Sequence, residues 1–211
     1  MRFTGEIAGL GTTSGTRLVV GAWQDTPYGP FVDVMLEQRD GHRVLLAPTD
    51  QVAEVITGLY TFDEVVVGEV TVSASGSWRT VIAPGLVVQF SRGDRTTLGA
   101  VLRVVPRRIA TSPRYLRALS AVAGLVLPAV RTFGSARDGR RMCYGATDVH
   151  RIDRMHGTWR QRQLGQLTAV DPPVRFGFGS TPKTPGVTTV VTTVLSGPEP
   201  RRPPLLRGSA R

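Results

Sequence analysis

The 211-residue chain is nearly devoid of several residue types that common protein classes depend on. Its one cysteine, Cys143, cannot form an internal disulfide, and Met1–Gly15 contains no apolar run long enough for a signal-peptide core. The longest largely apolar segment, Ala118–Val130, is interrupted by Gly124 and Pro128 and is shorter than the roughly 20 residues that span a bilayer. These absences predict a cytoplasmic protein without a membrane-spanning segment.

Lysine and asparagine are also scarce. Arginine supplies 25 of the 26 basic residues, Lys183 is the only lysine, and asparagine is absent, a bias that a GC-rich genome imposes on codons. The net charge is −4 over residues 1–102, +10 over residues 103–162 and +4 over residues 163–211. The basic middle segment either binds anions such as nucleic acid, or is a solvated face partly neutralised by the acidic first half. Aromatic residues do not alternate with the arginines as base stacking requires, so nucleic-acid binding is not the favoured interpretation.

Glycine and proline, by contrast, are plentiful, with 24 and 15 residues, and 41% of the chain is hydrophobic. This composition favours many short strands joined by tight turns, because glycine and proline weaken helix interiors and supply turn conformations. The hydrophobic patterns predict strands at Arg2–Gly9, Thr16–Gln24, Phe31–Gln38, Arg43–Pro48, Glu64–Ala74, Trp78–Ile82, Leu86–Phe90, Thr97–Val105, Arg140–Tyr144, Asp148–Met155, Gly165–Val170, Val174–Gly177 and Val187–Leu195.

Two helices interrupt the strands. Asp50–Tyr60 has helical spacing of its apolar residues and Thr49 as N-cap, and a longer helix is expected from Pro113 to about Thr132, capped by Ser112. The chain is therefore expected to be mainly β, a β-rich α+β fold built as an antiparallel barrel-like or strongly curved sheet with two helices. Residues 1–196 are expected to form a single domain, and residues 197–211 a flexible tail rich in proline and arginine.

The glycine-rich run Gly9–Gly15 superficially has the form of a dinucleotide-binding loop. That chemistry needs a helix N-terminus behind the loop to meet the pyrophosphate. The residues that follow, Thr16–Val20, have the pattern of a strand. The run is therefore interpreted as a hairpin turn.

The stretch Tyr144–Ser180 holds two of the three histidines and is the expected location of polar chemistry. If the segment after Asp148 is a strand, its period of two places Asp148, His150 and His156 on one face. A carboxylate beside an imidazole suits a catalytic acid–base pair, which makes Asp148 and His150 candidate catalytic residues. His150 and His156 would lie about 20 Å apart, too far to share a metal. The alternative is that these residues form cross-strand ion pairs with arginines.

Arg175 follows Pro172–Pro173 and precedes the aromatic and glycine residues Phe176–Gly179. An inward-facing arginine needs an anionic partner, which is either an internal carboxylate or a carboxylate or phosphate of a ligand. Tyr144, Arg151 and Arg175 are the candidate ligand-binding residues. No cofactor and no metal are predicted.

The motifs GTTSGTRLVVG, LLAPT, TFDEV, the helix-initiating TSP and PPVRFGFGS cover residues 1 to about 195. On these motifs the chain resembles conserved hypothetical proteins of high-GC actinobacteria, a family that implies no function. The succession of hairpins, an interrupting helix and returning strands is also similar to lipocalin-like and acetoacetate-decarboxylase-like β barrels. That resemblance implies a ligand-binding barrel. It does not extend to Schiff-base decarboxylation, because no lysine lies on a core strand.

The leading hypothesis is that the protein binds a small anionic or amphipathic molecule in an apolar, barrel-like cavity. The first alternative is an enzyme that uses Asp148 and His150 as an acid–base pair, with Arg151 or Arg175 holding the substrate's charge. The second alternative is association with nucleic acid through the arginine-rich middle segment.

Overall fold

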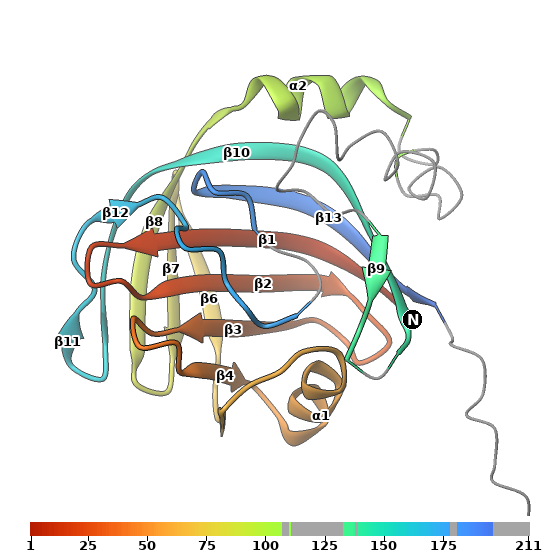
Figure 1. The fold of residues 1–211 in the computed structure, drawn as a ribbon. Helices are drawn as coiled ribbons and strands as arrows, with labels where there is room; N and C mark the ends of the chain where they lie inside the picture. The colour runs from red at the N-terminus through yellow and green to blue at the C-terminus, as the bar shows by residue number, and fades with distance from the viewer. Residues whose placement is uncertain (107–109, 111–132, 138, 178–180, 196–211) are drawn as a thin grey trace, which may run out of the picture.

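The computed structural model describes residues 1–106, 110, 133–137, 139–177 and 181–195 (Figure 1). The described helices are α1 (Asp50–Leu59) and α2 (Thr97–Val104). The described strands are β1 (Arg2–Thr12), β2 (Arg17–Asp25), β3 (Phe31–Glu37), β4 (Arg43–Ala47), β5 (Glu64–Val67), β6 (Thr71–Ser75), β7 (Trp78–Ala83), β8 (Leu86–Arg95), β9 (Phe133–Ser135), β10 (Arg141–Trp159), β11 (Arg162–Gln163), β12 (Leu167–Thr168) and β13 (Gly186–Leu195).

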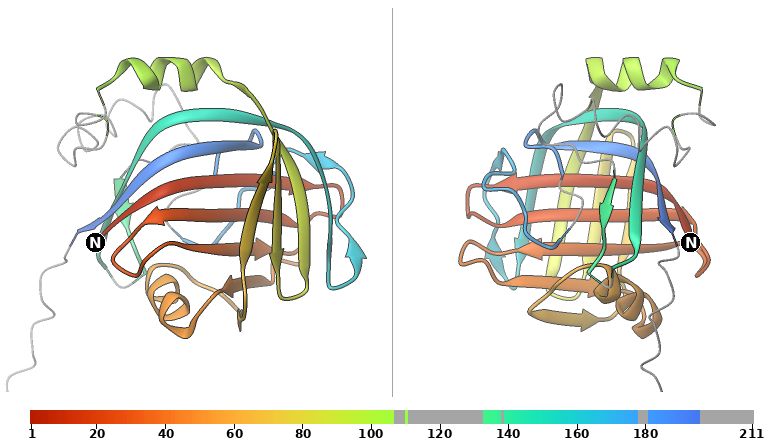
Figure 2. Two further views of the ribbon diagram at one scale, coloured as in Figure 1. Left: turned by 180° about the vertical axis from the view of Figure 1, so that it is seen from behind. Right: turned by 45° about the vertical axis from the view of Figure 1, so that its right-hand side comes forward.

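These strands form one 13-stranded sheet with the order β5-β4-β3-β2-β1-β13-β10-β8-β7-β6. Among the described strands, β4 and β5 are the one parallel pair, and α1 connects them, as a parallel pair requires a crossover. The sheet curls strongly into a half-barrel, in which β6, β7 and β8 cross over one face of β1–β4 (Figure 2). That covered face is called the concave face below.

Strand β10 joins the two layers of the curled sheet. It is 19 residues long. Its first part pairs with β9 and β13, and its second part pairs with β8. Its register shifts between Ala146 and Asp148, between His150 and Ile152, and between Ile152 and Met155. Such irregularities bend and twist a strand, which explains how one strand belongs to both layers.

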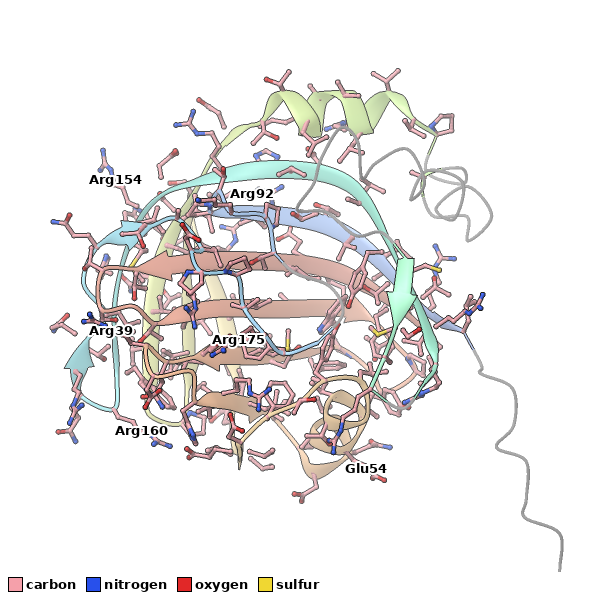
Figure 3. The ribbon with its side chains drawn as sticks, viewed as in Figure 1. Arg39, Glu54, Arg92, Arg154, Arg160 and Arg175 are labelled. Carbon is pink, nitrogen blue, oxygen red and sulfur yellow. The ribbon has the colours of Figure 1, made fainter. Side chains whose placement is uncertain are left out.

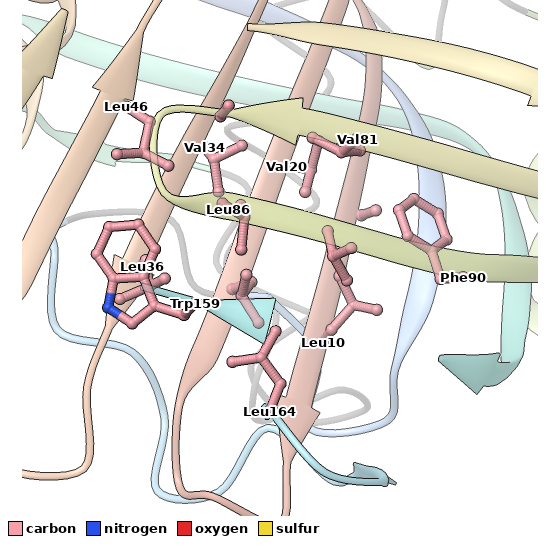
Figure 4. Packing of buried hydrophobic residues seen from close by; sticks show 14 of the residues in the cluster. Leu10, Val20, Val34, Leu36, Leu46, Val81, Leu86, Phe90, Trp159 and Leu164 are labelled. Carbon is pink, nitrogen blue, oxygen red and sulfur yellow. The ribbon is translucent and has the colours of Figure 1, made fainter. Parts of the chain in front are cut away.

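Two hydrophobic clusters cover the two faces of β1–β4. On the concave face, residues such as Leu10, Leu36, Leu86 and Phe90 pack between the layers (Figure 4). On the opposite face, α1 packs its buried residues against β2, β3 and β4. Consequently Val44–Ala47 in β4 is fully buried on both faces, in keeping with its continuous apolar sequence.

The prediction of a mainly β, strongly curved antiparallel sheet is confirmed. The helix predicted at Asp50–Tyr60 is α1, and Thr49 caps it by accepting a hydrogen bond from the N–H of Val52 at 3.3 Å. The run Gly9–Gly15 is a strand end and a turn, in which Gly15 has a φ of 84°. The hairpin-turn interpretation of that run is therefore correct.

Four strand predictions were wrong in whole or in part. Glu64–Ala74 is two strands, β5 and β6, which lie at opposite ends of the sheet order. Thr97–Val105 is the helix α2, where Gly99 lets the helix lie directly against β10, since a Cβ there would be 2.4 Å from the Val149 carbonyl oxygen. Val174–Gly177 is not a strand, although Val174 and Phe176 are buried as a strand pattern would have them, and Gly165–Val170 contains only the short β12.

The helix predicted from Pro113 to Thr132 and the tail 197–211 lie outside the described residues. Within the described ranges, no helix combines the length and the hydrophobicity that crossing a membrane requires.

Candidate ligand-binding site

A cavity of about 160 Å³ lies between the layers, on the concave face of β1 and β2 and beneath β6–β8. We call it the concave-face cavity. Its wall combines apolar and polar residues from both layers, and consists of Glu6, Ala8, Val20, Ala22, Gln24, Val72, Ser73, Ala74, Arg79, Phe90, Arg92 and Val187.

The cavity exists because side chains on the concave face become smaller along β1 and β2. Alternate residues of a strand point to one face, and directly paired residues of neighbouring antiparallel strands share that face. Leu10 pairs with Leu18, and both are fully buried in the core. Farther along the strands, Ala8 pairs with Val20 and Glu6 pairs with Ala22, so less volume is filled at that end.

The polar wall of the concave-face cavity centres on an ion pair. Arg92 Nη1 donates to Glu6 Oε1 at 2.8 Å, and the two side chains are 24% and 27% exposed. Among the described residues, Glu6 is the one hydrogen-bond partner of the Arg92 guanidinium, which keeps further N–H groups available. Arg79 donates to the carbonyl oxygens of Gly76 and Trp78, each at 3.1 Å. The formal charges of the three ionisable side chains in the wall, Glu6, Arg79 and Arg92, therefore add up to +1.

Strand pairing places Asp148 and His150 on the concave face as well. Asp148 pairs with Thr189, which in turn pairs with Glu6 of the cavity wall. His150 pairs with Val187, which also lines the cavity. Both predicted catalytic residues thus lie on the same face as the concave-face cavity, next to its wall.

The contacts of Asp148 and His150 differ from those of a hydrogen-bonded acid–base pair. Arg95 holds the Asp148 carboxylate with two nitrogens, Nε at 2.9 Å from Oδ1 and Nη2 at 3.1 Å from Oδ2. Partial burial works to raise the pKa of Asp148, but the hydrogen bond and the charge of Arg95 outweigh it and keep that pKa below its ordinary value. His150 Nδ1 lies 3.0 Å from the Gly93 carbonyl oxygen, an acceptor, so we assign the ring proton to Nδ1. His150 Nε2 is 3.6 Å from Asp148 Oδ2, beyond hydrogen-bonding distance.

Of the predicted ligand-binding residues, Arg151 lies away from the cavity wall. Its side chain is largely exposed, and its Nη2 is 3.4 Å from Asp153 Oδ1, a surface ion pair. This contact is an ion pair with a neighbouring acid on the same strand.

Arg175 pairs with an internal carboxylate, one of the two partners considered from the sequence. Its Nε lies 2.8 Å from Glu37 Oε1 and its backbone N–H donates to Glu37 Oε2 at 2.7 Å. Glu37 is fully buried and also pairs with Arg17 at 2.9 Å. The Arg175 side chain is 68% exposed and is not part of the wall of the concave-face cavity (Figure 3). The contact fastens the segment after β12 to β3.

Tyr144 lies on the opposite face of the sheet, in a second hollow beneath α1. Its hydroxyl and that of Tyr60 form a hydrogen bond. Four residues of these two hollows were not predicted from the sequence, namely Glu6, Arg79, Arg92 and Asp33. For Asp33 a signal existed, because Phe31 and Met35 flank it on the same strand face and mark that face as apolar.

No group of three or more histidine, cysteine, aspartate or glutamate side chains suited to a metal ion occurs within the described ranges. The one lysine of the sequence, Lys183, has a largely exposed side chain and pairs with Asp171 at 2.9 Å.

Neither protein-family models nor curated proteins match the sequence. Among solved structures, the chain is similar to the crystal structure of acetoacetate decarboxylase from Legionella pneumophila subsp. pneumophila str. Philadelphia 1. The sequences are 7% identical, the TM-score is 0.42, and the alignment covers 92% of this chain and 84% of that one. No property of that enzyme is assigned to this chain on similarity of this degree. Kinship with actinobacterial proteins stays a prediction.

Proposed function

We propose that the protein binds a small amphipathic molecule with an anionic group in the concave-face cavity. The observation that carries this proposal is the composition of the cavity wall, where apolar residues from both layers face two arginines and one glutamate. An apolar body would contact Ala8, Val20 and Phe90. Its carboxylate or phosphate would receive hydrogen bonds from Arg92, whose planar guanidinium matches such groups.

The size of the cavity limits the ligand. An apolar cavity of about 150 Å³ is large enough for a benzene-sized molecule. The concave-face cavity, at about 160 Å³, therefore suits a body of about six heavy atoms and is too small for a long acyl chain.

Glu6 competes with an anionic ligand for Arg92. In the structure the carboxylate of Glu6 accepts hydrogen bonds from Arg92 at 2.8 Å and from the Thr189 hydroxyl at 3.5 Å. Removing its charge while keeping its shape frees Arg92 for a second anion. Glu6→Gln should therefore strengthen anion binding, whereas Arg92→Gln should weaken it.

Benzoate is a suitable probe because it combines a six-carbon ring with a carboxylate, and benzyl alcohol is its neutral control. Isothermal titration calorimetry should show that Arg92→Gln weakens benzoate binding about tenfold and leaves benzyl alcohol binding within about twofold. Arg154→Gln removes the same charge from an exposed position and is the matched control (Figure 3).

Ala8→Leu tests the location of the site, since the larger side chain fills the cavity and should abolish binding of both probes. Benzoate binding that survives Ala8→Leu would refute the proposal. Native mass spectrometry of the protein isolated from its own host would then identify a retained natural ligand.

A second candidate, acid–base catalysis on the bound molecule, is favoured by the position of His150. Its Nδ1 is held by the Gly93 carbonyl, which leaves Nε2 as the proton acceptor, and it pairs with Val187 of the cavity wall. His150→Gln should stop turnover of the retained ligand and leave its binding within about twofold. Unchanged turnover would exclude this role.

Nucleic-acid association stays a prediction, because five of the thirteen arginines in residues 103–162 lie outside the described residues.

A further inference from the structure

A second hollow lies on the face of the sheet opposite the concave face, between β1–β3 and α1. We call it the α1-side cavity. Its volume is about 50 Å³, which is room for a group of only a few heavy atoms. Five aromatic rings contribute to its wall, those of Phe3, Trp23, Phe31, Tyr60 and Tyr144. Its remaining polar side chains are Asp33 and Thr192.

Asp33 is the one acid in the wall of the α1-side cavity, and its side chain is buried, with 2% of the residue exposed. Its Oδ1 accepts a hydrogen bond from Trp23 Nε1 at 2.8 Å. Within the described residues, nothing donates to Oδ2, and no lysine or arginine forms an ion pair with Asp33. A buried carboxylate without a cation is costly, so this oxygen is a strong acceptor that lacks a partner.

A glycine leaves the space that the contact between Asp33 and Trp23 occupies. Gly21 pairs with Asp33 across β2 and β3, and a Cβ at Gly21 would lie 2.5 Å from Asp33 Oδ1 and 2.6 Å from Trp23 Nε1. Any other residue at this position would displace the hydrogen-bonded pair. The close approach of Asp33 and Trp23 therefore depends on a residue without a side chain.

Thr192 provides a second, independent sign of a missing partner. It is 4% exposed, lines the α1-side cavity, and its hydroxyl oxygen has no hydrogen-bond partner in the described part of the chain. A buried hydroxyl without a partner costs about 1–3 kcal/mol. A bound group that donates hydrogen bonds would satisfy both Thr192 and Asp33.

We propose that the α1-side cavity binds a compact organic cation, a primary or methylated alkylammonium group. Asp33 would supply the opposite charge and the surrounding rings would contribute cation–π attraction. The rings form a connected group, with centroids 5.8 Å apart for Phe3 and Trp23, 6.4 Å for Phe3 and Phe31, and 6.4 Å for Trp23 and Phe31. This site is separate from the concave-face cavity, lies on the other face of the sheet and takes a ligand of opposite charge.

The protonation state of the site makes the proposal testable by pH. Burial raises the pKa of Asp33 to about 7, and the hydrogen bond from Trp23 lowers it only in part. Among the residues that the structure describes, the titratable groups that face Asp33 are Tyr60 and Tyr144. Burial raises the pKa of Tyr60 to about 12 and that of Tyr144 well above its ordinary value, so both stay neutral through this range. A cation that binds the ionised Asp33 must therefore displace a proton below pH 7.

The Trp23 indole N–H reports on the site directly, because it donates to Asp33. Its ¹H–¹⁵N resonance, assigned with Trp23→Phe, would be followed during titration with methylammonium chloride, whose two heavy atoms suit a cavity of about 50 Å³, at constant ionic strength. We expect saturable shifts whose apparent Kd rises about tenfold per pH unit below pH 7 and changes less than about twofold from pH 8 to 9. Neutral methanol, which is similar in size, should bind at least about tenfold more weakly.

Asp33→Asn should abolish the shift, while Glu54→Gln, which removes a charge from the exposed side of α1, should leave it unchanged (Figure 3). Thr192→Val should weaken methylammonium binding several-fold, because it removes the hydroxyl that would accept a hydrogen bond from the ammonium group. Equal responses to methanol, a Kd independent of pH, or no shift at about 100 mM methylammonium would each overturn the proposal. The pH and methanol measurements use the wild-type protein, so they hold even if Asp33→Asn does not fold.

Discussion

The acidic residues on the two faces of strands β1–β4 differ in exposure and in whether a cation pairs with them. On the concave face, Glu6 is about a quarter exposed and pairs with Arg92 at 2.8 Å. On the α1 side, Asp33 is buried with only Trp23 as a hydrogen-bond donor among the described residues, and burial raises its pKa to about 7. The difference shows that an acid on the concave face is paired with an arginine from the other layer, whereas an acid behind an aromatic wall has no cation beside it and a raised pKa.

The largest expected effect is the dependence of the free energy of unfolding on pH, which comes from Asp33 on the α1 side. Below pH 3.8, Asp33 is protonated in both the folded and the unfolded protein. Between pH 3.8 and about 7, it is ionised in the unfolded chain but still protonated in the folded protein. The free energy of unfolding should therefore fall across this window by on the order of 4 kcal/mol and then level off. Urea unfolding of Asp33→Asn should lack this decrease, which makes the variant more stable than wild type at pH 8. Identical pH profiles for the two proteins would contradict the assignment.

Gly21→Ala should break the packing of the α1 side. The added methyl group would lie 2.5 Å from Asp33 Oδ1, so the pair of Asp33 and Trp23 must move apart. We expect a loss of about 1–3 kcal/mol in unfolding free energy, the usual cost of overpacking. Denaturant unfolding at pH 5, where Asp33 is neutral, measures this cost without the contribution of charge, and a change under about 0.5 kcal/mol would count against it.

Ala8→Leu adds more volume than Gly21→Ala but on the face that has room for it. Because Ala8 lines a cavity of about 160 Å³, the larger side chain should cost about 1 kcal/mol or less. Thermal unfolding beside the benzoate titration would check both results on one sample. A cost as large as that of Gly21→Ala would show that the concave face has no spare volume.

The smallest effect is expected for the ion pair itself. A double-mutant cycle with Glu6→Gln and Arg92→Gln should give a coupling energy of about 0.5 kcal/mol, because both side chains keep partial contact with solvent. High salt should reduce it further. A coupling energy above about 2 kcal/mol would place the pair in the same class as buried charges such as Glu37.

Local sequence patterns were enough for elements whose determinants lie close together in the chain. Thr49 and the apolar spacing after it predicted α1, and the period-two pattern correctly placed Asp148 and His150 on one face. It placed His156 on that face wrongly, because the register shift between Ile152 and Met155 puts Met155 into the concave-face core instead. The residues at Thr97–Val105 were misassigned because the β-branched and apolar run hides a helix whose N-cap, Thr96, accepts from the Gly99 N–H.

The candidate sites were harder to predict, because their members come from distant strands. Glu6 and Arg92 are 86 positions apart and meet only through the order of strands in the sheet. Asp33 was not predicted as a site residue, although Phe31 and Met35 mark its strand face as apolar, because nothing in the local pattern of β3 indicates that α1 covers that face. Burial on both faces is a property of the whole architecture, and a two-residue period cannot report it.

The strand order has one more consequence. The sheet begins at β5 and ends at β6, and no hydrogen-bonded ladder joins these two terminal strands in the described chain. A closed barrel must break backbone hydrogen bonds to widen its interior, but here the layers are joined at that side by the short connection from β5 to β6, by the ion pair of Arg160 with Glu64 and by side-chain packing. Parting the two layers at that side therefore breaks no strand ladder, and the connection of residues 68–70 sets how far they can separate.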